Sequence, residues 1–150
     1  MRPTRHRRLA AACTFLATTA CANAHAPAPA ERVHGVISIP ILSSLPLGVV
    51  GVPHAGVPIT VVVRTFGSSS CDRPAGMDVV TGTATVTFTP WVTARTAGAI
   101  CTEDLRAWEH QATVVFPTAG PVRLSAYGVI QEPSGGQRLG TVSIDVTVQP

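Results

Sequence analysis

The residues of this sequence best suited to chemistry are its four cysteines, which fall into two pairs with different settings. Cys13 and Cys21 lie near the N-terminus beside an apolar run, whereas Cys71 and Cys101 lie in the body of the chain. An even number of cysteines in the mature part of an exported chain typically indicates disulfide bonds. Zinc usually needs close ligand pairs such as C-x2-C, and neither Cys71 nor Cys101 has one. We therefore predict a Cys71–Cys101 disulfide.

The first 24 residues have the three parts of a secretory signal peptide. Four arginines precede position 9, an uncharged run of apolar and small residues extends from Leu9 to Ala20, and Ala22-Asn23-Ala24 fits a small-x-small cleavage site. The run is shorter than the roughly 20 residues that a membrane span needs. We expect residues 1–24 to be removed from a chain that is exported to the periplasm or the cell surface.

A second cleavage site competes with the first. Thr18-Thr19-Ala20-Cys21 resembles a bacterial lipobox, although Thr18 stands where that motif has an aliphatic residue. The resemblance implies a lipoprotein signal of residues 1–20 and membrane attachment through a lipid on Cys21. Residues 25–32 follow as an Ala/Pro linker, which is expected to be semi-extended. The two cleavage sites predict different mature forms of the protein: a free form after cleavage at Ala24 and a lipid-anchored form that begins at Cys21.

Cleavage after Ala24 makes His25 the new N-terminus and raises a metal hypothesis. A free amine beside an imidazole chelates copper, and nitrogen ligands suit Cu(II). This start resembles that of CopC-like periplasmic copper-binding proteins, which implies copper held through His25, with His34, His54 and His110 as further candidate ligands. The Asp-x-His motif of that family is missing, because no histidine follows His110. Copper binding is the alternative function, and the leading prediction includes no cofactor.

The sequence carries no recognisable enzyme motif. G-x-S-x-G, H-E-x-x-H, the P-loop and the dinucleotide fingerprint are all absent. Three serines at 68–70 lie in a Gly/Ser turn with no histidine nearby in the sequence. We interpret the acidic residues near the cysteines as solvated loop charges: Asp72, Glu103 and Asp104. We interpret the large aromatics as core residues rather than a carbohydrate platform: Trp91, Trp108 and Tyr127. The protein is expected not to be an enzyme.

The charge of the chain changes when the signal is removed. The basic residues are all arginine, and seven of the 11 remain after position 8, against eight acidic residues. The net charge of this remainder is therefore −1, with no basic patch for nucleic acid or for anionic lipid. We exclude nucleic acid as a partner and expect an unidentified protein or another envelope component.

A hydrophobic period of two dominates the body of the chain. Threonines alternate with apolar residues over 83–89, and the same pattern returns over 141–148 and more loosely over 121–130. We expect further strands at 33–39, 58–66 and 112–116, with a turn at 73–76. Residues 39–58 are apolar but are interrupted by prolines. We expect them to form a kinked strand that switches between sheets. The alternative is an exposed apolar patch. Residues 101–108 predict one helical turn capped by Thr102.

These strands predict an all-β domain over residues 33–150, a β-sandwich of about seven antiparallel strands. Residues 112–124, with an apolar strand, Phe116, a turn ending at Gly120 and an alternating strand, resemble the E–F corner of bacterial immunoglobulin-like (Ig-like) domains. Val122 stands where antibody-type domains have Tyr. The resemblance implies an Ig-like fold but no particular activity. We expect a non-enzymatic exported Ig-like module with a structural or binding role at the bacterial cell envelope.

Overall fold

The protein is all-β in a computed structural model that describes residues 31–40 and 45–150. The described residues form nine strands and no helix: β1 (Arg32–His34), β2 (Val36–Ser38), β3 (Leu47–Val50), β4 (Pro58–Gly67), β5 (Pro74–Thr81), β6 (Thr85–Thr93), β7 (Arg106–Val115), β8 (Gly120–Gln131) and β9 (Gln137–Val148). None of this part of the chain could therefore cross a membrane as an apolar helix. The predicted signal peptide, Cys21 and His25 lie outside the described residues, as does most of the predicted linker.

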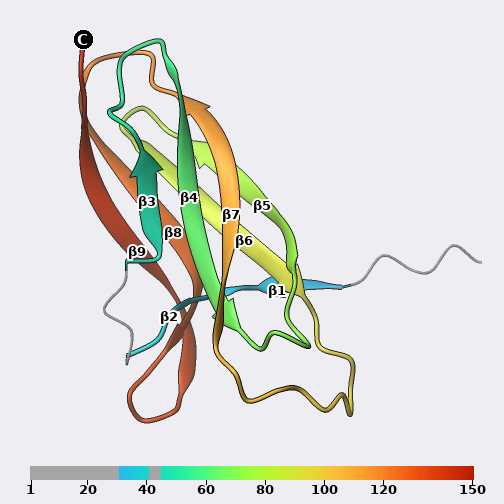
Figure 1. Ribbon diagram of the computed structural model, residues 1–150. Helices are drawn as coiled ribbons and strands as arrows, with labels where there is room; N and C mark the ends of the chain where they lie inside the picture. Colours follow the sequence, from blue (N-terminus) through green and yellow to red (C-terminus); the bar gives the residue numbers. More distant parts are fainter. Residues whose placement is uncertain (1–30, 41–44) are drawn as a thin grey trace, which may run out of the picture.

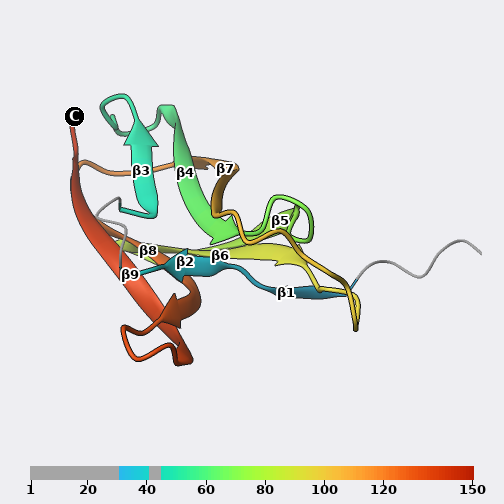
Figure 2. The ribbon, with the colours of Figure 1, turned by 60° about the horizontal axis from the view of Figure 1, so that its bottom comes forward.

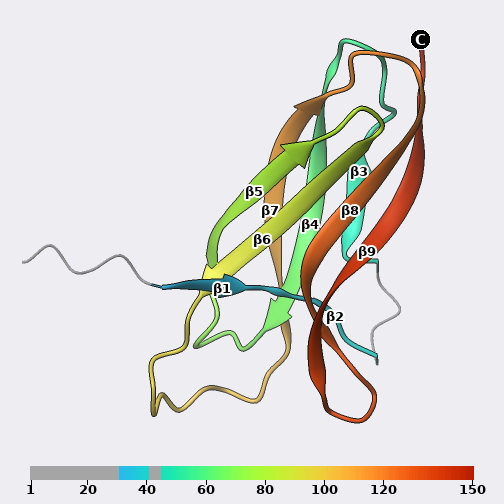
Figure 3. The same cartoon turned by 180° about the vertical axis from the view of Figure 1, so that it is seen from behind.

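The strands hydrogen-bond into one mixed sheet that is arranged in two layers. Strands β5, β6, β8 and β9 lie side by side in one layer, and β3, β4 and β7 lie in the other (Figure 1; Figure 3 shows the opposite side). The short strands β1 and β2 lie at one end of the two layers (Figure 2). β1 pairs with β6, and β2 lies between β4 and β8, so β2 joins the two layers.

Two of the strand pairs are parallel, so the prediction of antiparallel strands alone is wrong. β6 runs parallel to β8, with Phe88 opposite Ala126, and β2 runs parallel to β8, with Val36 opposite Val129. Parallel neighbours need a long crossover connection. The chain between β6 and β8 makes that crossover through β7, which lies in the other layer (Figure 1).

The crossing from β1 to β2 depends on the absence of a side chain at Gly35. The Gly35 N–H donates to the Pro90 carbonyl at 3.0 Å, and the Gly35 carbonyl accepts from the Val129 N–H at 2.9 Å. A Cβ at this position would lie 2.4 Å from the Thr65 Cγ2 atom. The backbone therefore passes directly against strands of both layers, which only glycine permits without a shift.

The alternation seen in the sequence decides what is buried. Along β6, Val86, Phe88 and Val92 are buried, whereas the threonines between them face outward and are half-buried or exposed. One apolar cluster fills the space between the layers and draws on both of them: Ile37, Leu47, Ile59, Val61, Val63, Val86, Phe88, Val114, Phe116, Val122, Leu124, Ala126 and Val148. Burial of these side chains stabilises the fold at roughly 25 cal/mol per Å² of apolar surface.

Three local predictions are wrong. Residues 101–105 form no helix, and Arg106 begins β7. The predicted turn at 73–76 overlaps the start of β5, where Pro74 pairs with Val92 of β6 and the register shifts between Pro74 and Met77. The strand that joins the layers is β2 rather than a strand within 39–58, where β3 is an edge strand paired only with β4 among the described residues.

Candidate functional site

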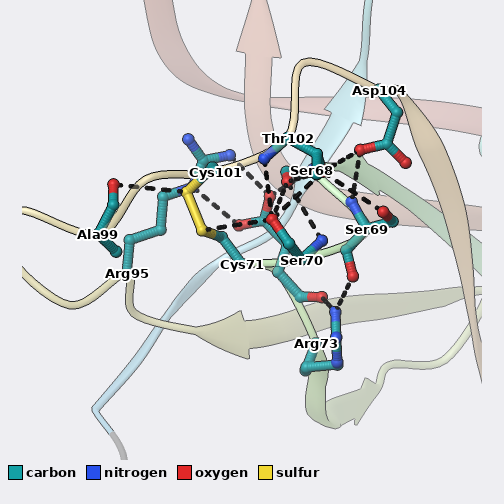
Figure 4. A network of polar contacts seen from close by, with 11 residues as sticks. Ser68, Ser69, Ser70, Cys71, Arg73, Arg95, Ala99, Cys101, Thr102 and Asp104 are labelled. Atoms are coloured by element: carbon teal, nitrogen blue, oxygen red, sulfur yellow. Dashed lines mark hydrogen bonds and ion pairs between the residues drawn. A yellow bond between two sulfur atoms is a disulfide. The ribbon is translucent and has the colours of Figure 1, made fainter.

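The predicted disulfide is present and joins two loops at one end of the sheet. Cys71 lies in the loop between β4 and β5, and Cys101 lies in the longer loop between β6 and β7, 30 residues further along the chain. Their Cα atoms are 5.5 Å apart, within the usual range for a disulfide. The bond ties both loops to each other beside a dense group of polar side chains (Figure 4).

Hydroxyl groups from both loops bond to one another next to the disulfide. The Ser68 and Thr102 hydroxyl oxygens are 2.9 Å apart, and the Thr102 N–H donates to the Ser70 hydroxyl at 2.9 Å. Asp104 accepts hydrogen bonds from the Ser69 N–H at 3.2 Å and from the Thr102 hydroxyl. Hydrogen bonds from Ser69 and then Thr102 hold the pKa of Asp104 below its ordinary value, so it stays ionised.

A second link between the loops is the ion pair of Asp72 and Arg95. The Asp72 carboxylate accepts two bonds from Arg95, at 3.0 Å from Nε and 2.6 Å from Nη2, and a third from the Ser68 N–H at 2.6 Å. Hydrogen bonding to Asp72 raises the pKa of Arg95. The side chain of Asp72 is only 10% exposed, so its interpretation as a solvated loop charge is wrong. Glu103 and Asp104 are exposed, as expected.

The polar network borders a cleft made of two adjoining cavities of about 480 and 270 Å³. Both cavities are lined by Val36, Arg95 and Gln137, so Arg95 lies where they meet. The larger cavity is mainly apolar and the smaller one mainly polar. Clefts that combine apolar walls with a few convergent polar groups are the usual form of ligand sites.

The structure does not bring together the described histidines that were candidate ligands in the alternative copper hypothesis. His54 lies near the C-terminus, with Nδ1 3.1 Å from the Pro150 main-chain oxygen. His34 stacks on Trp91 with ring centroids 4.4 Å apart, and His110 bonds to Thr65 and Gly76. Within residues 31–40 and 45–150, no group of three or more His, Cys, Asp or Glu could hold a metal ion.

The interpretation of the aromatics as core residues is wrong for Trp91. Its neighbours Pro90 and Val92 are buried, so Trp91 points to the outer face of β6. There its Nε1 donates to Asp78 at 2.8 Å, and the guanidinium carbon of Arg32 lies 5.0 Å from its ring centroid. Because His34 also stacks on this ring, Trp91 is not an open platform for a sugar. Trp108 is half-buried, with the guanidinium groups of Arg73 and Arg106 over its ring.

Arg95 is the site residue that sequence reasoning missed. It stands 23 positions from its partner Asp72 in a loop without a motif, so no local pattern marks the pair. The only available signal was the position of Asp72 immediately after Cys71, because the disulfide brings the segments on either side of it together.

The fold and this site define an all-β protein whose loop end is fixed by a disulfide and by an ion pair with a nearly buried carboxylate. No known protein family, curated protein or solved structure matches this chain.

Proposed function

We propose that this chain is a non-enzymatic exported module of Ig-like type that binds a component of the bacterial cell envelope through its disulfide-linked end. The Ig-like assignment is supported by the two layers of strands around a single apolar core and by the resemblance of residues 112–124 to an E–F corner. The parallel pairing of β2 and β6 with β8 distinguishes it from a purely antiparallel sandwich.

The observation that carries this proposal is the double linkage of the two loops. The Cys71–Cys101 bond and the Asp72–Arg95 ion pair fix the loop from β4 to β5 against the loop from β6 to β7. Binding residues commonly lie on loops positioned by a rigid scaffold. Loops already fixed before binding lose less conformational entropy when a ligand arrives, which favours affinity. The cleft beside Arg95 offers both apolar and polar contacts to such a ligand.

The predicted signal and the disulfide support export, because disulfides persist mainly in oxidising compartments. Two mature forms follow from the two cleavage sites, one that begins at His25 and one with a lipid on Cys21. Expression of the full chain in a bacterium, followed by intact mass spectrometry before and after reduction and alkylation, separates them. The proposal is supported if the protein is found in the envelope fraction, has the mass of either processed form and contains an oxidised Cys71–Cys101 pair. An unprocessed cytoplasmic chain with free thiols contradicts it.

Contact with an envelope component is tested by site-specific photo-crosslinking in living cells. Gln131 lines the cleft, whereas Gln111 is an exposed residue on β7, so the two positions form a matched pair. A photoreactive residue at 131 is expected to give a discrete cross-linked product with an envelope component, and one at 111 is expected to give none. Equal labelling from both positions, or none from 131, contradicts binding at this end of the protein.

A further inference from the structure

The cleft continues beyond the two cavities that meet at Arg95. A third hollow of about 410 Å³ shares Ile39, Leu105 and Gln131 with the polar cavity. The three hollows therefore follow one another, from the turn between β8 and β9, past the disulfide-linked loops, to β1 and β9. A row of hollows suits an extended chain segment better than a single compact molecule, because each hollow can take one side chain.

The far end of this row is an apolar cavity. Valines and a leucine from five strands form its apolar lining: Val33, Val36, Val92, Val129 and Leu139. Its polar lining consists of the paired Asp72 and Arg95 together with His34, Thr93 and Gln137. Val33 and Leu139 are 40% and 50% exposed, so the apolar surface is open to a ligand. Its volume of about 480 Å³ accommodates one branched apolar side chain together with neighbouring atoms.

Arg95 lines this apolar cavity, and its two hydrogen bonds to Asp72 fix its orientation. A guanidinium group has five N–H donors, and the bonds from Nε and Nη2 to Asp72 use two of them. The side chain of Arg95 is 55% exposed and lines both cavities. Its remaining donors suit a carboxylate, which guanidinium groups bind with two parallel hydrogen bonds.

The polar cavity on the other side of Arg95 carries acceptors. Glu103, Asp104 and Gln131 line it, together with the hydroxyl-bearing residues Ser68 and Thr102. Backbone N–H groups and cationic side chains match these acceptors. The row thus combines a donor for a terminal carboxylate, an apolar cavity next to it and acceptors for the preceding residues.

We infer that the cleft binds the C-terminus of an extended peptide, with the terminal carboxylate on Arg95, the last side chain in the apolar cavity and a preceding basic residue beside Glu103 and Asp104. This inference rests on the proposed function and names its ligand class. The peptide runs from the third hollow, past the disulfide-linked loops, and ends at Arg95.

The test is an NMR titration of the processed, isotope-labelled protein with acetyl-Gly-Lys-Val as the free acid and as the C-terminal amide. The free acid is expected to shift the amide signals of Val33, Arg95 and Leu139. The amide is expected to bind about ten- to a hundredfold more weakly, because it lacks the charge-assisted bonds to Arg95. Equal binding of the two peptides, or no shifts at millimolar peptide, overturns the inference.

Two variants with matched controls locate the binding. Arg95→Gln is expected to abolish the preference for the free acid, whereas Arg123→Gln, which alters another Arg–Asp pair on the open face of β8, should keep it. Should Arg95→Gln loosen the loops, Leu139→Glu blocks the apolar cavity at an exposed position, with the similarly exposed Val115→Glu as its control. Unchanged binding in both cleft variants overturns the inference.

The crosslinking experiment separates the two claims. If the peptide fails to bind but a photoreactive residue at 131 still captures an envelope component, the ligand class is wrong and the proposed function stands. If both experiments fail, the proposed function falls together with the inference.

Discussion

The His110 ring accepts a hydrogen bond at Nε2 from the Thr65 hydroxyl, 3.0 Å away, across the neighbouring strands β7 and β4. Its other nitrogen, Nδ1, lies 3.2 Å from the Gly76 carbonyl on β5. A carbonyl only accepts, so Nδ1 carries the proton and Nε2 is free to accept from Thr65. His110 is 4% exposed, and burial lowers its pKa. A neutral histidine thus connects three strands beside the core.

The first prediction is a loss of stability in mild acid. The pKa of His110 is lowered from 6.5 in the folded protein, so the unfolded chain takes up this proton first. The stabilisation that neutral His110 contributes is therefore complete above pH 6.5, the pKa in the unfolded chain. It is lost as the pH falls towards the lower pKa of His110 in the folded protein. The midpoint of urea unfolding is expected to drop between pH 7 and pH 5, above the range where most carboxylates titrate. His110→Gln is expected to reduce that drop.

His54→Gln serves as the control, because His54 is exposed. It is expected to leave the pH dependence of the midpoint as in the unaltered protein. An identical midpoint at pH 7 and pH 5, or the same drop in the His110→Gln variant, would contradict the role of His110.

The second prediction concerns the hydroxyl that faces His110. Thr65→Val keeps the shape of a fully buried side chain but leaves Nε2 without its donor. An unsatisfied buried acceptor costs about 1–3 kcal/mol, and we expect a loss near the middle of that range in the free energy of unfolding. Thr113→Val, at an exposed position on β7, should change it by less than about 0.5 kcal/mol. Equal effects at the two positions would show that the bond to His110 contributes nothing.

The third prediction concerns the disulfide. Replacing Cys71 and Cys101 by alanine together releases a closed loop of 30 residues. The chain-entropy relation gives about 3.7 kcal/mol of lost stability at 25 °C for a loop of this length. Denaturant unfolding of the double variant and of the reduced unaltered protein should agree. A loss below about 1 kcal/mol in both would mean that the two loops stay in place without the bond.

The fourth prediction compares two Arg–Asp pairs that differ in burial. Asp72→Ala removes a nearly buried carboxylate and leaves the Ser68 N–H and Arg95 without their acceptor. We expect a loss of about 2 kcal/mol, less than for a fully buried pair because water reaches Arg95. Asp145→Ala removes the partner of Arg123, where both side chains are mostly exposed, and should leave the urea midpoint unchanged. Similar midpoints for the two variants would contradict the importance of the Asp72 contacts.

The strands with a strong local pattern could be predicted from the sequence. The alternation over 83–89, 121–130 and 141–148 predicted strands β6, β8 and β9, because successive strand side chains point to opposite faces. It also predicted burial correctly for Phe88 and Leu124. Periodicity does not specify which strand pairs with which, however, so the parallel neighbours of β8 could not be predicted.

The misses arise where tertiary contacts override local preference. β5 contains Pro74 and Gly76, which predict a turn, yet Pro74 pairs with Val92 of β6, and after a register shift residues 77–81 pair with β6 without interruption. Thr102 has the chemistry of a helix cap, but its hydroxyl bonds to Ser68 and Asp104, and a strand follows. The cysteine pair could be predicted from the number of cysteines, whereas the bond between Asp72 and Arg95 depends on the fold that brings their loops together.

The last prediction concerns the crossing between the layers. Gly35→Ala places a Cβ 2.4 Å from Thr65 Cγ2, and Thr65 is fully buried and cannot move aside easily. The backbone between β1 and β2 must shift, and we expect a loss of about 1–3 kcal/mol. Gly48→Ala on β3, where a Cβ meets nothing within 4 Å, is the matched control and should be neutral or slightly stabilising. Equal urea midpoints for the two alanine variants would mean that the segment between β1 and β2 accommodates a Cβ atom at position 35 without a loss of stability.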